Sequence, residues 1–189
     1  LQPFIVTLCG LLIYRGVARF YTKDGTAGFS FGDEFPVLEW LVSGRAGGVP
    51  HSIIAFTVVA VIAWFVLHRT VFGRHLFAVG KNPEAARYTG IKTRRVIVIA
   101  YVICAVLTGL SAIFFAMYTR SIHPASHGNF YELYAIAAAV LGGFSLRGGE
   151  GSIVGVVLGV VLLQVLQNLV NLLGIPSSLN FAVMGSVIL

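Results

Sequence analysis

The sequence predicts an all-α membrane protein: a polytopic bundle of transmembrane helices with one very short helix in a cytoplasmic loop. The 189 residues are 57% hydrophobic and only 11% charged, whereas soluble domains carry about a quarter charged residues. Their mean hydropathy is +0.89. The apolar residues gather in long uncharged runs, and more than half of the 13 basic residues fall in one short connection between two of these runs.

The uncharged runs set the expected spans, since a helix needs about 20 residues to cross roughly 30 Å of hydrocarbon. The run at 133–146 is shorter and contains Gly142 and Gly143, so a tilted span, a broken helix and a re-entrant segment all fit it. Pro176 and the serines after it separate the last two runs. We therefore expect residues 1–189 to form part of one transmembrane domain, with spans at about 1–20, 50–70, 96–118, 153–173 and 181–189, the last one truncated.

The two ends of the chain support the same view. Residue 1 is a leucine inside an apolar run, and the final residues stop inside another. No basic region followed by a small-residue cleavage site marks a signal peptide. We expect the chain to be a piece of a longer polytopic protein.

Charge gives the expected orientation. The loop 68–95 holds seven basic residues against Glu84, and the loop 21–50 holds two basic residues against four acids. Because short basic loops stay in the cytoplasm, 68–95 should be cytoplasmic and 21–50 external. The net charge of +6 then reflects orientation and contact with lipid head groups rather than nucleic acid. Arg15 and Arg19 fit this orientation poorly and would have to snorkel from the first span.

The stretch "GKNPEAARYTGI" at 80–91 predicts a helix over 83–89. It offers an N-cap amide, a first-position proline, an acid at the helix start, two alanines, a base towards the end and a glycine to terminate it. An ordinary loop helix and a lever that passes motion from a soluble partner to the spans fit this pattern equally well. The residues are Asn82, Pro83, Glu84, Ala85, Ala86, Arg87 and Gly90.

Four amides form a second candidate site. Gln164, Gln167, Asn168 and Asn171 recur at i, i+3, i+4 and i+7, which places them on one helical face. An amide facing lipid is costly, so this face should meet protein or water. Hydrogen bonding between helices is one interpretation. Lining a route for a polar, uncharged solute is the other, because amides both donate to and accept from hydroxyl groups.

Other patterns exclude several kinds of site. The glycine cluster at 142–152 lacks the GK[ST] ending of a phosphate loop, so a hinge or tight turn is favoured over nucleotide binding. Gly155 and Gly159 form a GxxxG pair, which predicts close helix packing within the chain or in a dimer. Pro124 separates His123 from His127, and we expect no metal site. We also find no catalytic set and expect neither an enzyme nor a cofactor.

The source of energy is a further expectation. The spans carry no acidic or basic residue away from their ends, whereas ion-coupled carriers commonly use such groups inside the membrane. This disfavours a secondary carrier and favours an energy source on another protein. A carrier or channel that works without ATP remains the alternative.

Several ordered blocks resemble the permeases of ribose/xylose-type sugar ABC importers. In the cytoplasmic loop these blocks are Gly73-Arg74, Phe77-Ala78-Val79-Gly80, Glu84-Ala85-Ala86-Arg87 and Gly90-Ile91. The stretches "YELYAIAAAVLGGFSLRGGEGSIVGVVLG", "LQNLVNLLGIPS" and "LQPFIVTLCGLLIYRGVA" also resemble that family. The likeness covers nearly the whole chain. It departs at Tyr134, where the family commonly has an acid, and in the length of the 21–50 loop.

The resemblance implies a transport subunit in the bacterial inner membrane. In this family the permease carries no ATPase site, two permeases form the pore, and two ATP-binding-cassette subunits dock beneath them. A periplasmic or extracellular solute-binding protein delivers the cargo, here expected to be a monosaccharide. Residues 83–89 would be the coupling helix that inserts into a groove of the ATP-binding subunit. Related permeases serve a furanosyl signal molecule, nucleosides or branched-chain amino acids.

Overall fold

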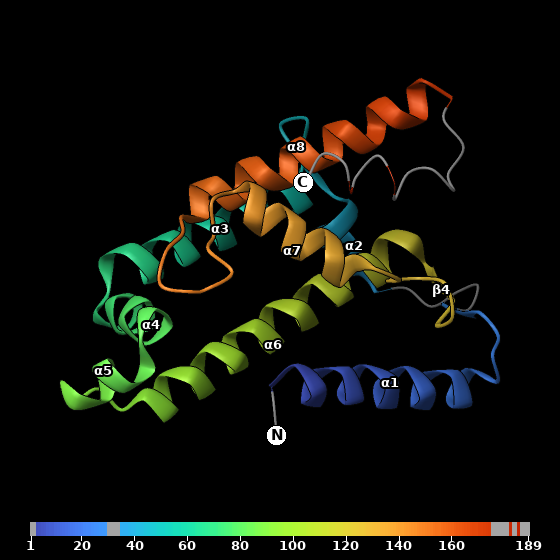
Figure 1. Cartoon of the computed structure of the whole chain (residues 1–189). Coiled ribbons are helices and arrows are strands. Elements are labelled where there is room, and N and C mark those ends of the chain that lie inside the picture. Colours follow the sequence, from blue (N-terminus) through green and yellow to red (C-terminus); the bar gives the residue numbers. More distant parts are fainter. Residues whose placement is uncertain (1–2, 30–34, 175–181, 183–184, 186–189) are drawn as a thin grey trace. The chain divides into compact units, whose positions relative to one another are not determined.

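The computed structural model describes residues 3–29, 35–174, 182 and 185 (Figure 1). Most of the truncated span expected at 181–189, and the break at Pro176, lie outside the described residues. The chain divides into two compact units. One contains residues 1–54 and 107–130, and the other contains residues 55–106 and 131–189. The helices α3 (His51–Arg69) and α6 (Thr93–Thr119) each contribute to both units.

Among the residues that the structure describes, four helices are long and apolar enough to cross a membrane, which confirms the predicted class of an all-α polytopic bundle. These are α1 (Pro3–Thr22), α3, α6 and α8 (Ile153–Leu172). Their apolar side chains are largely exposed in the isolated chain. In each helix, no more than 17% of the most apolar stretch is buried. A helix that is apolar on all sides needs lipid or other protein around it, so these surfaces fit a membrane.

The first unit contains structure within and beside the expected 21–50 loop that sequence reasoning missed. A short helix, α2 (Pro36–Ser43), is followed by a hairpin whose strands β2 (Arg45–Ala46) and β3 (Val49–Pro50) are antiparallel. Gly47 and Gly48 form its two-residue loop with positive φ angles of 59° and 87°, as a type I′ turn requires. A second antiparallel pair joins β1 (Ala27–Gly28) to β4 (Ser121–Ile122).

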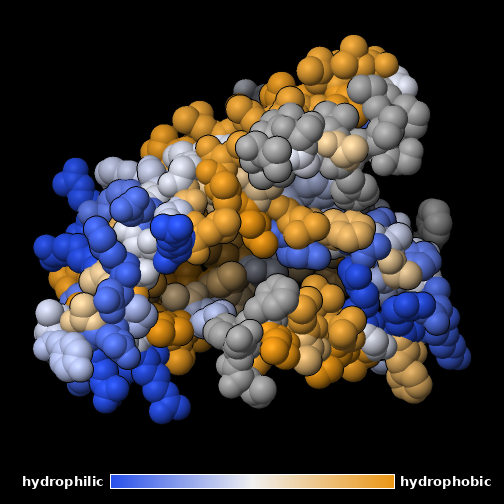
Figure 2. Space-filling view, viewed as in Figure 1, coloured by the Kyte–Doolittle hydropathy of each residue, from blue (hydrophilic) through white to orange (hydrophobic). Residues whose placement is uncertain are grey.

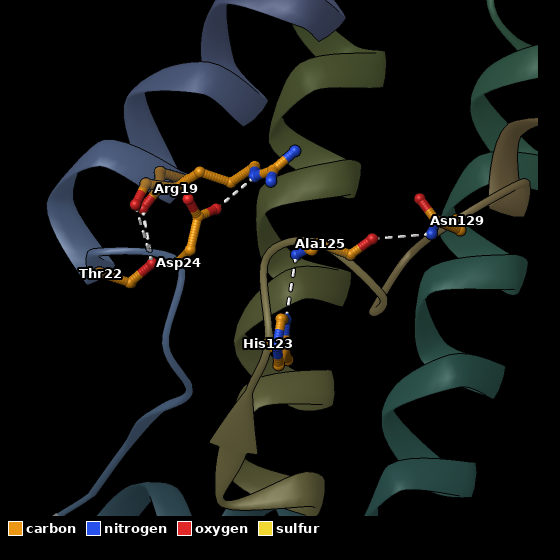
Figure 3. Close-up of polar contacts among 7 residues, drawn as sticks. Arg19, Thr22, Asp24, His123, Ala125 and Asn129 are labelled. Carbon is orange, nitrogen blue, oxygen red and sulfur yellow. Dashed lines mark hydrogen bonds and ion pairs between the residues drawn. The ribbon is translucent and has the colours of Figure 1, made fainter.

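Ion pairs link elements of this unit. Arg120 Nη2 lies 2.7 Å from Glu39 Oε1, which links the end of α6 to α2. Arg19 pairs with Asp24 just beyond the end of α1 (Figure 3). Arg19, which fits the predicted orientation poorly, therefore has a carboxylate partner beside the end of its helix. Both pairs are partly exposed, so each contributes about 0–1 kcal/mol to stability.

The second unit contains the residues of both candidate sites. It comprises parts of α3 and α6 together with α4 (Val71–Lys81), α5 (Pro83–Tyr88), α7 (Tyr131–Leu141) and α8. Helices α7 and α8 lie side by side (Figure 1), and Leu163 of α8 is buried against Ala137 and Ala138 of α7. Tyr134 packs half-buried against this cluster, at the position where the resembling family commonly has an acid.

Helix α7 is short for a span. Its 11 residues rise about 17 Å, roughly half of the hydrocarbon thickness. The helix ends where Gly143 adopts a φ of 84°, and the Phe144 N–H donates to the Ala139 carbonyl at 2.9 Å, as in a Schellman cap. The apolar run expected at 133–146 is therefore helical only in its first part.

Candidate functional site

The short helix α5 is closed at both ends by its own residues. Asn82 Oδ1 accepts from the backbone N–H groups of Glu84 and Ala85, each at 3.0 Å, which confirms the predicted N-cap. Gly90 adopts a φ of 85°, which confirms the predicted left-handed terminator. The Gly90 N–H donates to the Arg87 carbonyl at 3.0 Å. The helix ends at Tyr88, one residue earlier than expected.

One face of α5 is fixed to its neighbours. Ala86 is 5% exposed and packs with Val79 of α4 and Val96 of α6. Partly buried side chains surround this cluster: Phe72, Leu76, Ala78 and Ile91. The Ile91 N–H donates to the Ala86 carbonyl at 3.2 Å, so the chain leaving α5 is held against the same cluster. As a result α5 is attached rigidly to the end of α4 and the start of α6.

The opposite face of α5 is open. Glu84, Ala85, Arg87 and Tyr88 are all exposed, and the Tyr88 side chain is 90% exposed. Sequence reasoning missed Tyr88 as a candidate site residue. Its signal was an aromatic residue four positions after Glu84 in an otherwise polar loop. Because tyrosine is enriched among the residues that dominate binding energy at interfaces, this face has the character of a docking surface.

Basic residues surround α5. Figure 2 shows hydrophilic side chains gathered over α4 and α5, whereas hydrophobic ones dominate the far end of α8. All seven basic residues of the 68–95 segment are exposed, and Glu84 is the only acid of that segment. Such a surface suits an acidic protein groove or lipid head groups. The seven are Arg69, Arg74, Lys81, Arg87, Lys92, Arg94 and Arg95.

The amide stripe lies on α8, on the flank of its contact with α7. Leu163 and Val170 are the buried side chains in this half of the helix. Gln164, Asn168 and Asn171 are exposed and Gln167 is half-buried. None of the four amide side chains makes a hydrogen bond to another residue in the part of the chain that the structure describes. The stripe is therefore open to a partner, to water or to a solute.

The GxxxG pair of α8 packs inside the chain. A Cβ on Gly155 or Gly159 would collide with backbone atoms of Gly142 and Ala138, respectively. The two glycines thus bring the α8 backbone against the end of α7. Sequence reasoning left open whether this pair serves a dimer or an intramolecular contact, and the structure places it in the intramolecular one.

The histidine pair at 123 and 127 closes a turn. The His127 Nδ1 accepts from the His123 N–H at 3.0 Å, and the His123 Nδ1 accepts from the Ala125 N–H at 3.2 Å (Figure 3). Within the described residues no group of three His, Cys, Asp or Glu side chains could hold a metal ion. The two rings therefore have a structural use in the loop after β4.

The two candidate sites are on different helices. The α5 residues predicted from sequence lie together within the basic segment, and the four amides lie along α8. They are connected through α4, whose last turn meets the turn between α7 and α8 at Gly80 and Gly149.

Comparison with known proteins gives a consistent result. The family described as branched-chain amino acid transport system / permease component matches residues 1–189. The ribose import permease of Escherichia coli is 39% identical over 188 residues, covering 100% of this chain and 58% of that protein. The ribose import permease of Bacillus subtilis is 40% identical over 191 residues, covering 100% of this chain and 58% of the relative.

A galactose relative is more distant. The galactose/methyl galactoside import permease of Treponema pallidum is 35% identical over 198 residues, covering 100% of this chain and 36% of that protein. The chain therefore spans a little over half the length of the two ribose permeases and about a third of this one. No solved structure matches it.

Proposed function

We propose that this chain, which belongs to the family of branched-chain amino acid transport system permease components, is part of the membrane subunit of an ATP-binding-cassette importer for a monosaccharide. The observation that carries the proposal is the match of the whole chain to two ribose import permeases at 39% and 40% identity. The galactose import permease matched at 35% supports a sugar as the cargo. The open amide stripe on α8 suits a hydroxyl-rich, uncharged solute.

The proposal assigns the two sites to two steps. The exposed face of α5 is the coupling surface, which seats in a groove of an ATP-binding subunit where hydrolysis takes place. The amides of α8 line part of the route taken by the sugar. A solute-binding protein brings the sugar to the outer side, and a second permease copy or a paralogue completes the pore.

The charge distribution supports the orientation in this proposal. The exposed basic residues around α5 mark the cytoplasmic side, following the positive-inside rule. The acid-rich segment 21–50 then lies outside, where it holds α2 and the β2–β3 hairpin. Membrane lipid contacts the apolar faces of the long helices.

The function is tested with the full-length protein in proteoliposomes, together with a candidate ATP-binding subunit and a solute-binding protein. We expect the ATP-binding subunit to co-purify and its ATPase rate to rise with loaded binding protein. Uptake of labelled ribose, xylose or galactose should require ATP, and leucine should not be taken up. Sugar uptake without the ATP-binding subunit would indicate a carrier or channel instead. Uptake of leucine alone would contradict the proposed cargo.

Tyr88 gives a direct test of the coupling surface. Truncating a tyrosine that acts as an interface hot spot costs about 2 kcal/mol of binding free energy, which corresponds to about a 30-fold loss of affinity. We expect Tyr88→Ala to weaken binding of the ATP-binding subunit by about this factor, as measured by titration in detergent. Tyr118→Ala is the matched control, since Tyr118 is 81% exposed at the opposite end of α6. Equal affinities for both variants would remove Tyr88 from the docking surface.

A further inference from the structure

We propose that Gly80, Gly148 and Gly149 form a backbone contact that transmits the movement of α5 to the α7–α8 pair. This inference rests on the proposed function, in which α5 moves with an ATP-binding subunit. It concerns a step that neither α5 nor the amide stripe explains: how a displacement at one reaches the other. The three glycines are positioning residues that touch neither the solute nor the ATP-binding subunit.

The contact is unusually close because no side chain separates the two backbones. A Cβ on Gly80 would lie 2.6 Å from the backbone N of Gly149. A Cβ on Gly148 would lie 2.7 Å from the Gly80 carbonyl oxygen, and one on Gly149 would lie 2.8 Å from the Cβ of Lys81. Real Cβ atoms are essentially never found at such distances. Only glycine at these positions lets the last turn of α4 meet the turn between α7 and α8.

The α5 side of the contact is stiff. Asn82 follows Lys81 directly and serves both helices, since its N–H donates to the Ala78 carbonyl of α4 and its side chain caps α5. Ala86 holds α5 against α4 and α6 through the buried cluster with Val79 and Val96. A displacement of α5 must therefore carry the end of α4, including Gly80, with it.

The other side is stiff as well. Within the turn after α7, the Ser145 N–H donates to the Glu150 carbonyl at 3.2 Å and the Gly148 N–H donates to the Ser145 carbonyl at 2.9 Å. Gly142 meets Gly155 backbone to backbone, which locks α7 to α8 directly beyond this turn. A displacement of Gly148 and Gly149 therefore moves α7 and α8 as one body. The amides lie in the C-terminal half of α8 and move with it.

Two rigid bodies in direct backbone contact transmit displacement, because close-packed atoms are hard to compress, whereas flexible side chains between them would absorb part of it. This accounts for the glycine cluster that sequence reasoning assigned to a hinge or turn. We assign a different role to this turn: it contacts the last turn of α4 and moves when α4 and α5 move.

The variant Gly80→Ala tests the proposal. Gly80 lies in α4 without a positive φ, so alanine favours the helix there, but its Cβ forces the turn away from Gly149. Gly109→Ala is the matched control: it makes the same change inside α6, where nothing lies within 4 Å of the new Cβ. Both are made in the full-length protein, reconstituted with the ATP-binding subunit and the binding protein.

Two readouts separate transmission from docking. The first is the affinity of the ATP-binding subunit, and the second is the number of sugar molecules transported per ATP hydrolysed. For Gly80→Ala we expect unchanged affinity and a fall of about 5-fold or more in sugar per ATP, the lower end of typical coupling factors. Gly109→Ala should match the wild type in both. An unchanged transport ratio in Gly80→Ala, or a loss of affinity, would overturn the proposal.

A reporter on α8 makes the test independent of uptake. Cys9 and Cys104 are first replaced by serine, because both are exposed. A fluorescent label on Leu172→Cys, at a position that is 79% exposed in the native chain, should then change its emission between nucleotide-free and ATP-bound states when Gly80 and Gly109 are native. We expect this change to disappear with Gly80→Ala and to persist with Gly109→Ala. Persistence with Gly80→Ala would overturn the transmission step. If the wild type shows no change and no ATP-dependent uptake, it is the proposed function that fails.

Discussion

We expect Gly90→Val to lower sugar uptake by up to about tenfold, while the protein still inserts into the membrane. Gly90 adopts a φ of 85°, a conformation that costs a side-chain-bearing residue about 1–2 kcal/mol, and more when it is β-branched. Its N–H closes α5 on the Arg87 carbonyl, and the next residue, Ile91, packs on the cluster that holds Ala86. Valine therefore favours an opened end of α5, in which the coupling surface is lost.

The size of the effect follows from the population of the closed form. A penalty of about 1.4 kcal/mol shifts the ratio of closed to opened form about tenfold, so the apparent affinity for the ATP-binding subunit falls by up to that factor. Gly90→Asn is the control, because asparagine tolerates the left-handed region and nothing lies within 4 Å of a Cβ there. ATP-driven uptake by proteoliposomes measures both variants. Equal uptake for valine and asparagine would remove α5 from the coupling step.

We expect Asn168→Leu to lower sugar uptake about tenfold without loss of assembly. The Asn168 amide is exposed on α8 and lies in the middle of the stripe. A polar route that loses one of its hydrogen-bonding groups binds a hydroxyl-rich solute less well in transit, and a hydrogen bond is worth about 0.5–1.5 kcal/mol. The leucine also places an apolar branch in that route. Uptake and co-purification of the ATP-binding subunit are measured on the same preparation.

The control for Asn168→Leu is Val165→Leu. Val165 is 61% exposed on the same helix, and the helical spacing places it away from the amide face. Normal uptake with Val165→Leu and reduced uptake with Asn168→Leu support a role in the route. If Asn168→Leu instead loses the assembled complex, the stripe serves hydrogen bonding between helices.

Local signals explain why part of this architecture could be predicted. Long uncharged runs reveal apolar helices, because each helix satisfies its own backbone within the run. The structure places α3 over His51–Arg69 and α6 over Thr93–Thr119, where runs at 50–70 and 96–118 were recognised. The ends of α5 are also local, because Asn82 and Gly90 act on backbone groups within three residues of themselves.

The features that were missed depend on partners distant in the sequence. The β1–β4 pair joins Gly28 to Ser121, and no sequence pattern in either segment predicts that it pairs with the other. Arg120 and Glu39 are likewise 81 residues apart. The contact of Gly80 with Gly149 could not be predicted, because glycines at these positions are equally expected in ordinary turns. The exposure of Tyr88 follows from the burial of Ala86 on the other side of the helix.

For the amide stripe, the sequence predicts the geometry but not the contacts. The spacing of Gln164, Gln167, Asn168 and Asn171 correctly predicts a shared face, because α8 is a regular helix there. What that face meets depends on surfaces outside the described chain, since no described residue bonds to it. Its role in the route therefore stays a prediction that the leucine variant tests.

Cysteine labelling of the exposed face of α5 tests the central claim most directly. Cys9 and Cys104 are first replaced by serine in the full-length protein, because both are exposed. Ala85→Cys then reports on α5, and Ser43→Cys reports on the end of α2; both positions are exposed. In intact cells a membrane-impermeant maleimide should label Ser43→Cys and spare Ala85→Cys, and only Ala85→Cys should crosslink to the ATP-binding subunit. Labelling of Ala85→Cys in intact cells would contradict the account.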